Sequence, residues 1–281
     1  MLSRPEFVQD EEFRSIRNTG RTENSHNGTI VVKIGGSTLG SHDTTIEDLI
    51  AFQQEGIQPV VVHGGGKAVT DWMERQGVRT RFVKGLRFTD EPSLDIVVAV
   101  LTGLINKQLV SSVLSLGGKA VGLSGVDGGI LQAEILDPDL GYVGKVTKVN
   151  TEPIHAAVDS GFMPVIAPVA IRLSEGEATL LNVNADTAAG EIAAALGVQK
   201  LVFMTDVEGV LDSSRRLIPR ITERQAKSLM QSNVIAGGMI PKIGACLRNI
   251  GEGCTARIID GRKPHALRSF LDGEAVGTRV G

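Results

Sequence analysis

The 281-residue sequence has little of several features, and each shortage excludes a class of protein. Its two cysteines stand without metal-ligand spacing, so we expect no disulfide framework and a reducing cytoplasm. A formal net charge of −3 disfavours nucleic-acid binding, which requires a basic face. No apolar run is long enough to span a membrane, because the longest, at 94–116, contains Asp95 and Lys107. These shortages predict a cytoplasmic protein that binds neither nucleic acid nor membrane.

The two commonest nucleotide-binding fingerprints are also missing. After Gly64-Gly65-Gly66, Val69 replaces the third glycine of the dinucleotide pattern, and no acidic residue ends the next strand at the expected distance. None of the Gly-Lys pairs is followed by Ser or Thr, as a P-loop requires. A nicotinamide-dependent oxidoreductase is therefore a disfavoured alternative.

The stretch from Thr179 to Asp212 carries the most chemistry. A short apolar run at 179–181 leads into Asn182, Asn184 and Asp186, just before an Ala-rich helix expected at 187–196. A buried strand is expected at 200–204, so we interpret the segment as a βαβ unit, which places ligands at the carboxyl ends of strands. One helix cap needs only one such residue, so three polar residues here favour a ligand site over a cap alone.

Two further strands end in glycine loops. The β-branched strand at 29–34 carries Lys33 near its end and opens into Gly35-Gly36. The strand at 59–62 runs into His63 and three glycines before a helix at 67–76. A lysine that ends an apolar strand costs stability unless its ammonium meets an anion, and glycine N–H groups can face a phosphate unobstructed. The pair predicts an anion site, although a triple glycine can also be only a tight turn.

Two other cations and one long helix complete the pattern. Arg87 lies among turn residues, where it is either a bidentate carboxylate clamp or a solvated surface side chain. Lys242 opens a helix, where the dipole disfavours a cation unless an anion is bound. The helix at 91–116 is apolar around most of its circumference, which predicts burial against the sheet on one side and a second subunit on the other. A hairpin at 130–148 is expected to stand off the main sheet.

Seven motifs in order, KIGG, VVHGGG, GLRFTD, LNVNADTAAG, TDVEGVLD, GGMIPK and IIDGRKPHAL, resemble those of the N-acetylglutamate kinases in the amino acid kinase family. The resemblance covers Thr29 to Val280. It implies an α/β fold: a three-layer αβα sandwich with a central, mainly parallel sheet, as in carbamate kinase. It also implies an N-terminal extension at 1–28, a lobe at 29–175 for acyl amino acid binding and dimerisation, and a lobe at 176–281 for ATP.

The resemblance further implies a role for each matching residue. Lys33 and Lys242 would stabilise the transition state, with Asp186 between them as organiser. The other implied positions are Gly36 and Gly65 for the phosphate; Gly65, Gly66, Arg87 and Asn182 for the acyl substrate; and Asp206, Val207, Gly209, Val210, Leu211, Ile235 and Met239 for the nucleotide.

The implied reaction is ATP-dependent phosphorylation of the side-chain carboxylate of N-acetyl-L-glutamate, the second step of arginine biosynthesis. A carboxylate nucleophile is already ionised, so no general base is needed and none is evident. Magnesium would arrive with ATP and be held by the phosphates, since the sequence has no obvious carboxylate cluster for a metal. A sister acyl-amino-acid kinase acting on aminoadipate attached to a carrier protein, and a non-catalytic regulatory homologue, stay open; the first should differ around Arg87 and Asn182.

The resemblance also bears on assembly. Arginine-inhibited relatives form hexamers through an N-terminal helix, and they have a tyrosine after the first lysine and a glutamate soon after PHAL. This chain has Ile34 and Arg268-Ser269 at those places. We therefore expect a homodimer, or a loosely formed hexamer, with weak or no arginine inhibition.

Overall fold

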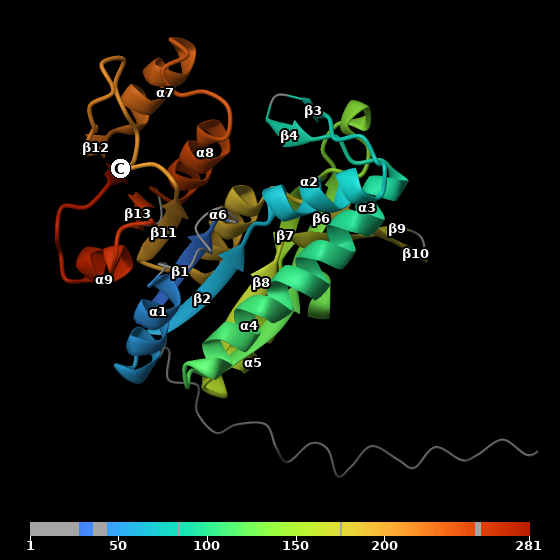
Figure 1. The fold of residues 1–281 in the computed structure, drawn as a ribbon, viewed down its shortest axis with the longest axis horizontal. Coiled ribbons are helices and arrows are strands. Elements are labelled where there is room, and N and C mark those ends of the chain that lie inside the picture. The colour runs from blue at the N-terminus through green and yellow to red at the C-terminus, as the bar shows by residue number, and fades with distance from the viewer. Residues whose placement is uncertain (1–27, 36–43, 84, 175, 251–253) are drawn as a thin grey trace, which may run out of the picture.

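The computed structural model describes residues 28–35, 44–83, 85–174, 176–250 and 254–281 (Figure 1). The expected N-terminal extension, apart from Gly28, and Gly36 lie outside the described residues. The strands are β1 (Thr29–Ile34), β2 (Gln58–His63), β3 (Phe82–Val83), β4 (Leu86–Arg87), β5 (Ala120–Ser124), β6 (Leu131–Ile135), β7 (Gly144–Val149), β8 (Met163–Ala167), β9 (Val169–Ser174), β10 (Glu177–Asn182), β11 (Lys200–Thr205), β12 (Arg220–Ile221), β13 (Thr255–Asp260) and β14 (Thr278–Val280). The helices are α1 (Thr45–Gln54), α2 (Gly66–Arg75), α3 (Glu91–Val98), α4 (Asn106–Ser115), α5 (Glu152–Asp159), α6 (Ala185–Leu196), α7 (Glu223–Gln231), α8 (Met239–Ile250) and α9 (Ala266–Leu271).

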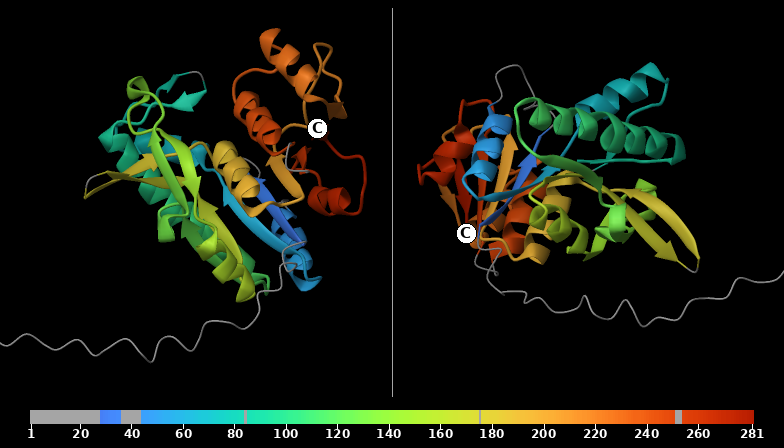
Figure 2. Two further views of the ribbon diagram at one scale, coloured as in Figure 1. Left: turned by 180° about the vertical axis from the view of Figure 1, so that it is seen from behind. Right: turned by 90° about the horizontal axis from the view of Figure 1, so that it is seen from below.

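An eight-stranded sheet forms the centre, in the order β12-β14-β13-β11-β1-β2-β8-β5. Neighbouring strands from β13 to β5 are parallel, and β14 is antiparallel to β13. Helices cover both faces, as the two views of Figure 2 show. The predicted αβα sandwich with a mainly parallel central sheet is confirmed.

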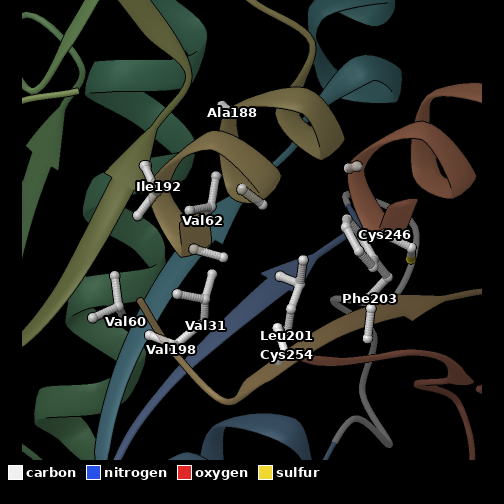
Figure 3. Packing of buried hydrophobic residues seen from close by; sticks show 14 of the residues in the cluster. Val31, Val60, Val62, Ala188, Ile192, Val198, Leu201, Phe203, Cys246 and Cys254 are labelled. Atoms are coloured by element: carbon white, nitrogen blue, oxygen red, sulfur yellow. The ribbon is translucent and has the colours of Figure 1, made fainter. Parts of the chain in front are cut away.

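The alternation of side chains along β1 creates two cores. Val31 packs with β2, α6 and α8 on one face, whereas Ile30 and Val32 pack with α1, the helix at 91–115 and α9 on the other. Figure 3 shows the first of these cores, where Val31, Val60 and Val62 lie against α6. Because Lys33 has the parity of Val31, its side chain is directed to the α6 face. The strand period thus aims a cation at the helix that carries Asp186.

Helix α6 begins and ends as its sequence predicts. Asn184 is the N-cap, and its side chain accepts hydrogen bonds from the backbone N–H groups of Asp186 and Thr187, each at 3.0 Å. Gly197 follows in the left-handed conformation, with φ 63°, and terminates the helix. The N-terminal end of α6 lies at the carboxyl end of β1, since Asp186 in the first turn of α6 contacts Lys33 of β1.

The prediction of a βαβ unit in this segment is wrong. Strand β10 pairs antiparallel with β9 in a separate four-stranded sheet, ordered β10-β9-β6-β7, whereas β11 belongs to the central sheet. A single apolar strand does not show which sheet it will join, because both sheets offer unpaired edges to the same sequence pattern. The β6–β7 pair of this second sheet confirms the hairpin that was predicted to stand off the main sheet.

The long helix at 91–115 is one continuous element built from α3, a π-helical stretch (Ala99–Ile105) and α4. By length and composition it could cross a membrane, contrary to the expectation from its polar residues. Its buried side chains, among them Val97, Leu101 and Leu109, belong to the second core, so we assign it as a partly buried core helix.

Candidate functional site

A cavity of about 220 Å³ opens where the carboxyl ends of β1 and β2 meet the N-terminus of α6. Ligand sites in open α/β sheets lie at this edge of the strands. The cavity brings together eight residues that the sequence singled out: Lys33, Gly64, Gly65, Gly66, Arg87, Asn182, Asn184 and Asp186.

Asp186 joins two lysines from distant parts of the chain. Its Oδ1 lies 2.9 Å from Nζ of Lys33, and its Oδ2 accepts a hydrogen bond of 2.9 Å from Nζ of Lys242. The Asp186 side chain is 6% exposed, so water screens these contacts little. Lys242 enters the group from the first turn of α8. One carboxylate thus holds two ammonium groups close together at the edge of the cavity.

Opposing effects act on the pKa of Lys33. Burial lowers the pKa of its ammonium, Asp186 opposes that change, and Lys242 adds to the lowering. The cluster of two cations and one anion keeps a net positive charge when both lysines are protonated. A bound anion would therefore complete the charge balance of this buried group.

The glycine loop after β2 is shaped by the long helix beside it. A Cβ at Gly65 would collide with the side chains of Leu101 and Ile105. Gly66 begins α2, and the first N–H groups of a helix have no partner inside it. The loop therefore has backbone donors beside the cavity, and at Gly65 a side chain would have no room.

The amide of Asn182 is held by a residue that the sequence analysis gave no role. Its Nδ2 donates to Oγ1 of Thr89 at 3.0 Å, and Thr89 donates in turn to the carbonyl of Arg87 at 3.0 Å. Thr89 is fully buried. The GLRFTD motif draws attention to the residues around Arg87 but does not single out Thr89. The contact between Thr89 and Asn182 joins residues 93 positions apart, so no local pattern predicts it.

Arg87 lines the cavity and is not a solvated surface side chain, since it is 9% exposed. Its Nη2 donates to the carbonyl of Gly66 at 2.9 Å and to Oγ1 of Thr70 at 2.8 Å. Its Nη1 donates to the sulfur of Met73 at 3.1 Å. The guanidinium thus braces α2, and binding a carboxylate through both terminal nitrogens requires it to exchange some of these protein acceptors. The clamp stays a prediction.

The proposed nucleotide residues do not line this cavity. Asp206, Val207, Gly209, Val210 and Leu211 lie on the segment that follows β11, and Ile235 and Met239 lie just before and at the start of α8. The side chains of Val210 and Ile235 are 2% and 1% exposed in the first core. A nucleotide could reach these two residues only through their backbone, whereas Asp206 is exposed.

Two other buried polar residues lie behind the glycine loop. His63 ends β2, and Asn106 begins α4; both are fully buried. The sequence gave no role to either, and the only signal was a histidine inside the VVHGGG motif.

Metal ligands are a separate matter. Within the described residues no three His, Cys, Asp or Glu side chains gather as a metal cluster. Around the Asp186 carboxylate, which already contacts two ammonium groups, the cavity offers backbone N–H groups, a guanidinium and side-chain amides, and this predominance of N–H donors suits an anion rather than a bare cation.

Comparison with known proteins agrees with this geometry. The chain matches the amino acid kinase family over residues 28–260. It is 45% identical over 259 residues to an acetylglutamate kinase of Dehalococcoides mccartyi, covering 91% of this chain and 95% of that protein. An acetylglutamate kinase of Caldanaerobacter subterraneus is 45% identical over 264 residues, covering 90% and 87%. The structure of Giardia lamblia carbamate kinase bound to AMP-PNP superimposes with a TM-score of 0.65 at 16% identity, covering 91% and 99%, and shows the shared fold. Because the family match covers most of the chain, this chain belongs to the amino acid kinase family.

Proposed function

We propose that this protein transfers the γ-phosphoryl group of ATP to the side-chain carboxylate of N-acetyl-L-glutamate. The observation that carries the proposal is the Lys33–Asp186–Lys242 group at the edge of a cavity lined by glycine N–H groups, Arg87 and Asn182. The two acetylglutamate kinases at 45% identity support the same activity.

The chemistry needs charge stabilisation more than proton transfer. A carboxylate oxygen attacks the γ-phosphorus, a new O–P bond forms, and the bond to the β-phosphate oxygen breaks as ADP leaves. The acceptor is ionised at neutral pH, so no proton has to move. Lys33 and Lys242 would neutralise charge on the transferring group and on the leaving oxygen, and Asp186 would keep both ammonium groups in place.

Further parts of the proposal concern the ligands. The N–H groups of Gly65 and Gly66 would hold the acyl substrate and the phosphoryl oxygens, and Asn182, oriented by Thr89, would bind the acyl substrate. Residues 206–211 and 235–239 would hold ATP, so that the lobe at 29–175 binds the acceptor and the lobe at 176–281 the nucleotide. Magnesium would be held by the phosphate oxygens and would supply additional positive charge there.

The decisive experiment measures ADP formation with purified full-length protein, ATP and magnesium. We expect turnover with N-acetyl-L-glutamate, much less with aminoadipate attached to its carrier protein, and almost none without an acceptor. Faster turnover with the carrier-bound aminoadipate would identify the sister kinase instead. No turnover with either acceptor, in protein that still binds ATP, would favour the regulatory homologue.

Arg87→Lys tests the carboxylate clamp. Lysine keeps the positive charge but lacks the planar fork, so a bidentate contact is lost. We expect the KM for acetylglutamate to rise by about tenfold or more, while the KM for ATP changes little. Because Arg87 also braces α2 through Gly66 and Thr70, thermal unfolding is measured in parallel. Equal effects on both KM values would show that the residue is only structural.

We further propose that the protein is a cytoplasmic homodimer joined through the long helix. Leu104, Leu114 and Leu116 are 36%, 53% and 52% exposed on that helix or just after it. Light scattering on the full chain should give the mass of a dimer, or of a hexamer if dimers associate further. Leu104→Glu combined with Leu114→Glu should shift the mass to that of a monomer, because two charges would have to be buried. A monomeric parent protein would contradict the proposal.

A further inference from the structure

The histidine of the glycine loop has no contact with solvent, yet both of its ring nitrogens have polar neighbours. Nδ1 of His63 lies 2.9 Å from the carbonyl oxygen of Gly64, and Nε2 lies 3.2 Å from Nδ2 of Asn106. These contacts connect the loop to the first residue of α4, directly after the π-helical stretch. Such stretches are often found at functional sites.

The orientation of the Asn106 amide determines which ring nitrogen carries the proton. Its Nδ2 also faces the carbonyl oxygens of Val165 at 2.8 Å and Leu123 at 3.1 Å, and its Oδ1 accepts from Nζ of Lys107 at 3.0 Å. Nδ2 is therefore the donor group, so it cannot accept a hydrogen bond from Nε2 of His63, and Nε2 faces it without a proton. The ring then carries its single hydrogen on Nδ1 and donates it to Gly64.

The surroundings support this neutral form. Burial lowers the pKa of His63 to about 4, with Lys33 and Lys107 adding to the lowering. Space is also reserved for the amide, because a Cβ at Gly122 would collide with Oδ1 of Asn106.

The consequence for the site follows from peptide geometry. The peptide between Gly64 and Gly65 is trans, so its C=O and N–H point in opposite directions. A carbonyl held toward His63 directs the N–H of Gly65 away from the histidine, and Gly64, Gly65 and Gly66 all line the cavity. A flipped peptide would turn an oxygen toward the bound anion in place of a donor.

We propose that His63, itself oriented by Asn106, is a positioning residue that locks the Gly64–Gly65 peptide with its N–H toward the phosphoryl-transfer site. The expected effect on kinetics rests on the proposed function, whereas the expected orientation of the Gly64–Gly65 peptide does not. It links the long helix, through Asn106, to the geometry of the anion site.

A matched pair of variants tests the role. The amide of Asn can occupy the place of Nδ1, and the amide of Gln the place of Nε2. His63→Asn therefore keeps a donor for Gly64, whereas His63→Gln keeps only the contact with Asn106. We expect kcat/KM for acetylglutamate to stay within about threefold of the parent in His63→Asn and to fall by about tenfold or more in His63→Gln, with the KM for ATP little changed in both. Equal losses in the two variants, in step with equal losses of melting temperature, would overturn the proposal.

A second measurement does not depend on activity. In the ¹⁵N spectrum of histidine-labelled protein, the signals that disappear in His63→Asn should show Nδ1 protonated and Nε2 unprotonated, from neutral pH down to about pH 5. The opposite tautomer, or a doubly protonated ring at neutral pH, would refute the positioning role even in an active enzyme. If instead the parent protein had no activity but showed the expected tautomer, only the proposed function would fail.

Discussion

Lys242→Ala is expected to lower kcat by about a hundredfold or more while the protein remains folded. The ammonium of Lys242 lies 2.9 Å from Asp186 and is one of only two cations in this group. Its removal takes away charge that would stabilise the transferring phosphoryl group, an interaction made mainly in the transition state. The change should therefore appear in kcat more than in either KM.

The fold should tolerate this substitution, because Asp186 keeps Lys33 as a partner at 2.9 Å. Lys227→Ala is the matched control: it removes an exposed lysine from a surface pair with Glu223, and such pairs contribute about 0–1 kcal/mol. The control should retain full turnover. Near-normal turnover in folded Lys242→Ala protein would remove Lys242 from the catalytic group. Steady-state kinetics measures turnover, and circular dichroism checks folding, in the parent, Lys242→Ala and Lys227→Ala proteins.

Asp186→Asn should have an equally large effect on turnover and an additional effect on stability. Asparagine keeps the shape of the side chain but leaves two nearly buried ammonium groups without their shared counter-charge. Removing one partner of a buried ion pair costs up to about 3–5 kcal/mol. We expect kcat to fall by about a hundredfold or more and the urea midpoint to drop clearly.

The stability loss of Asp186→Asn should depend on pH in a defined direction. Asp186 raises the pKa of Lys33 against burial, so its loss lowers that pKa further below the ordinary value of 10.5. Between the variant's pKa and the parent's, Lys33 has lost its proton in the folded variant but keeps it in the folded parent and in both unfolded chains, so only the variant gains stability as the pH rises. The deficit of the variant should therefore shrink as the pH increases through this window, which lies below 10.5, and stay constant above it. A deficit that grows with pH would show that Asp186 does not hold a charged Lys33.

Asp71→Asn serves as the control, since it removes a carboxylate from an exposed pair with Lys67. It should alter neither turnover nor the pH dependence of unfolding. ATP offers a further check, because a polyanion that binds the two ammonium groups should restore more stability to Asp186→Asn than to the parent. An equal gain in both proteins would indicate that ATP does not approach these lysines.

Local pattern was enough to predict many of the elements. The β-branched run at 29–34 predicted β1, Gly197 predicted the end of α6, and the alternation along β1 directs Lys33 to the α6 face. These features depend on neighbours within a few residues, where propensity, capping and side-chain period act directly. Of the three polar residues around the start of α6, Asn184 caps the helix and Asp186 pairs with the lysines, whereas the ligand site that the three residues favour stays a prediction.

Tertiary structure decided what depends on distant parts of the chain. Whether β10 joins the central sheet or a second sheet is set by competition between edges, which a single strand does not encode. The sequence suggested Arg87 as either a clamp or a surface residue, and only packing against α2 shows a buried brace. The contacts of Thr89 with Asn182 and of Asn106 with His63 span 93 and 43 positions. The sequence alone thus determined which groups could bind an anion, whereas only long-range packing determined which of them meet, because hydrogen bonds require donor and acceptor within about 3 Å and no local pattern fixes that distance.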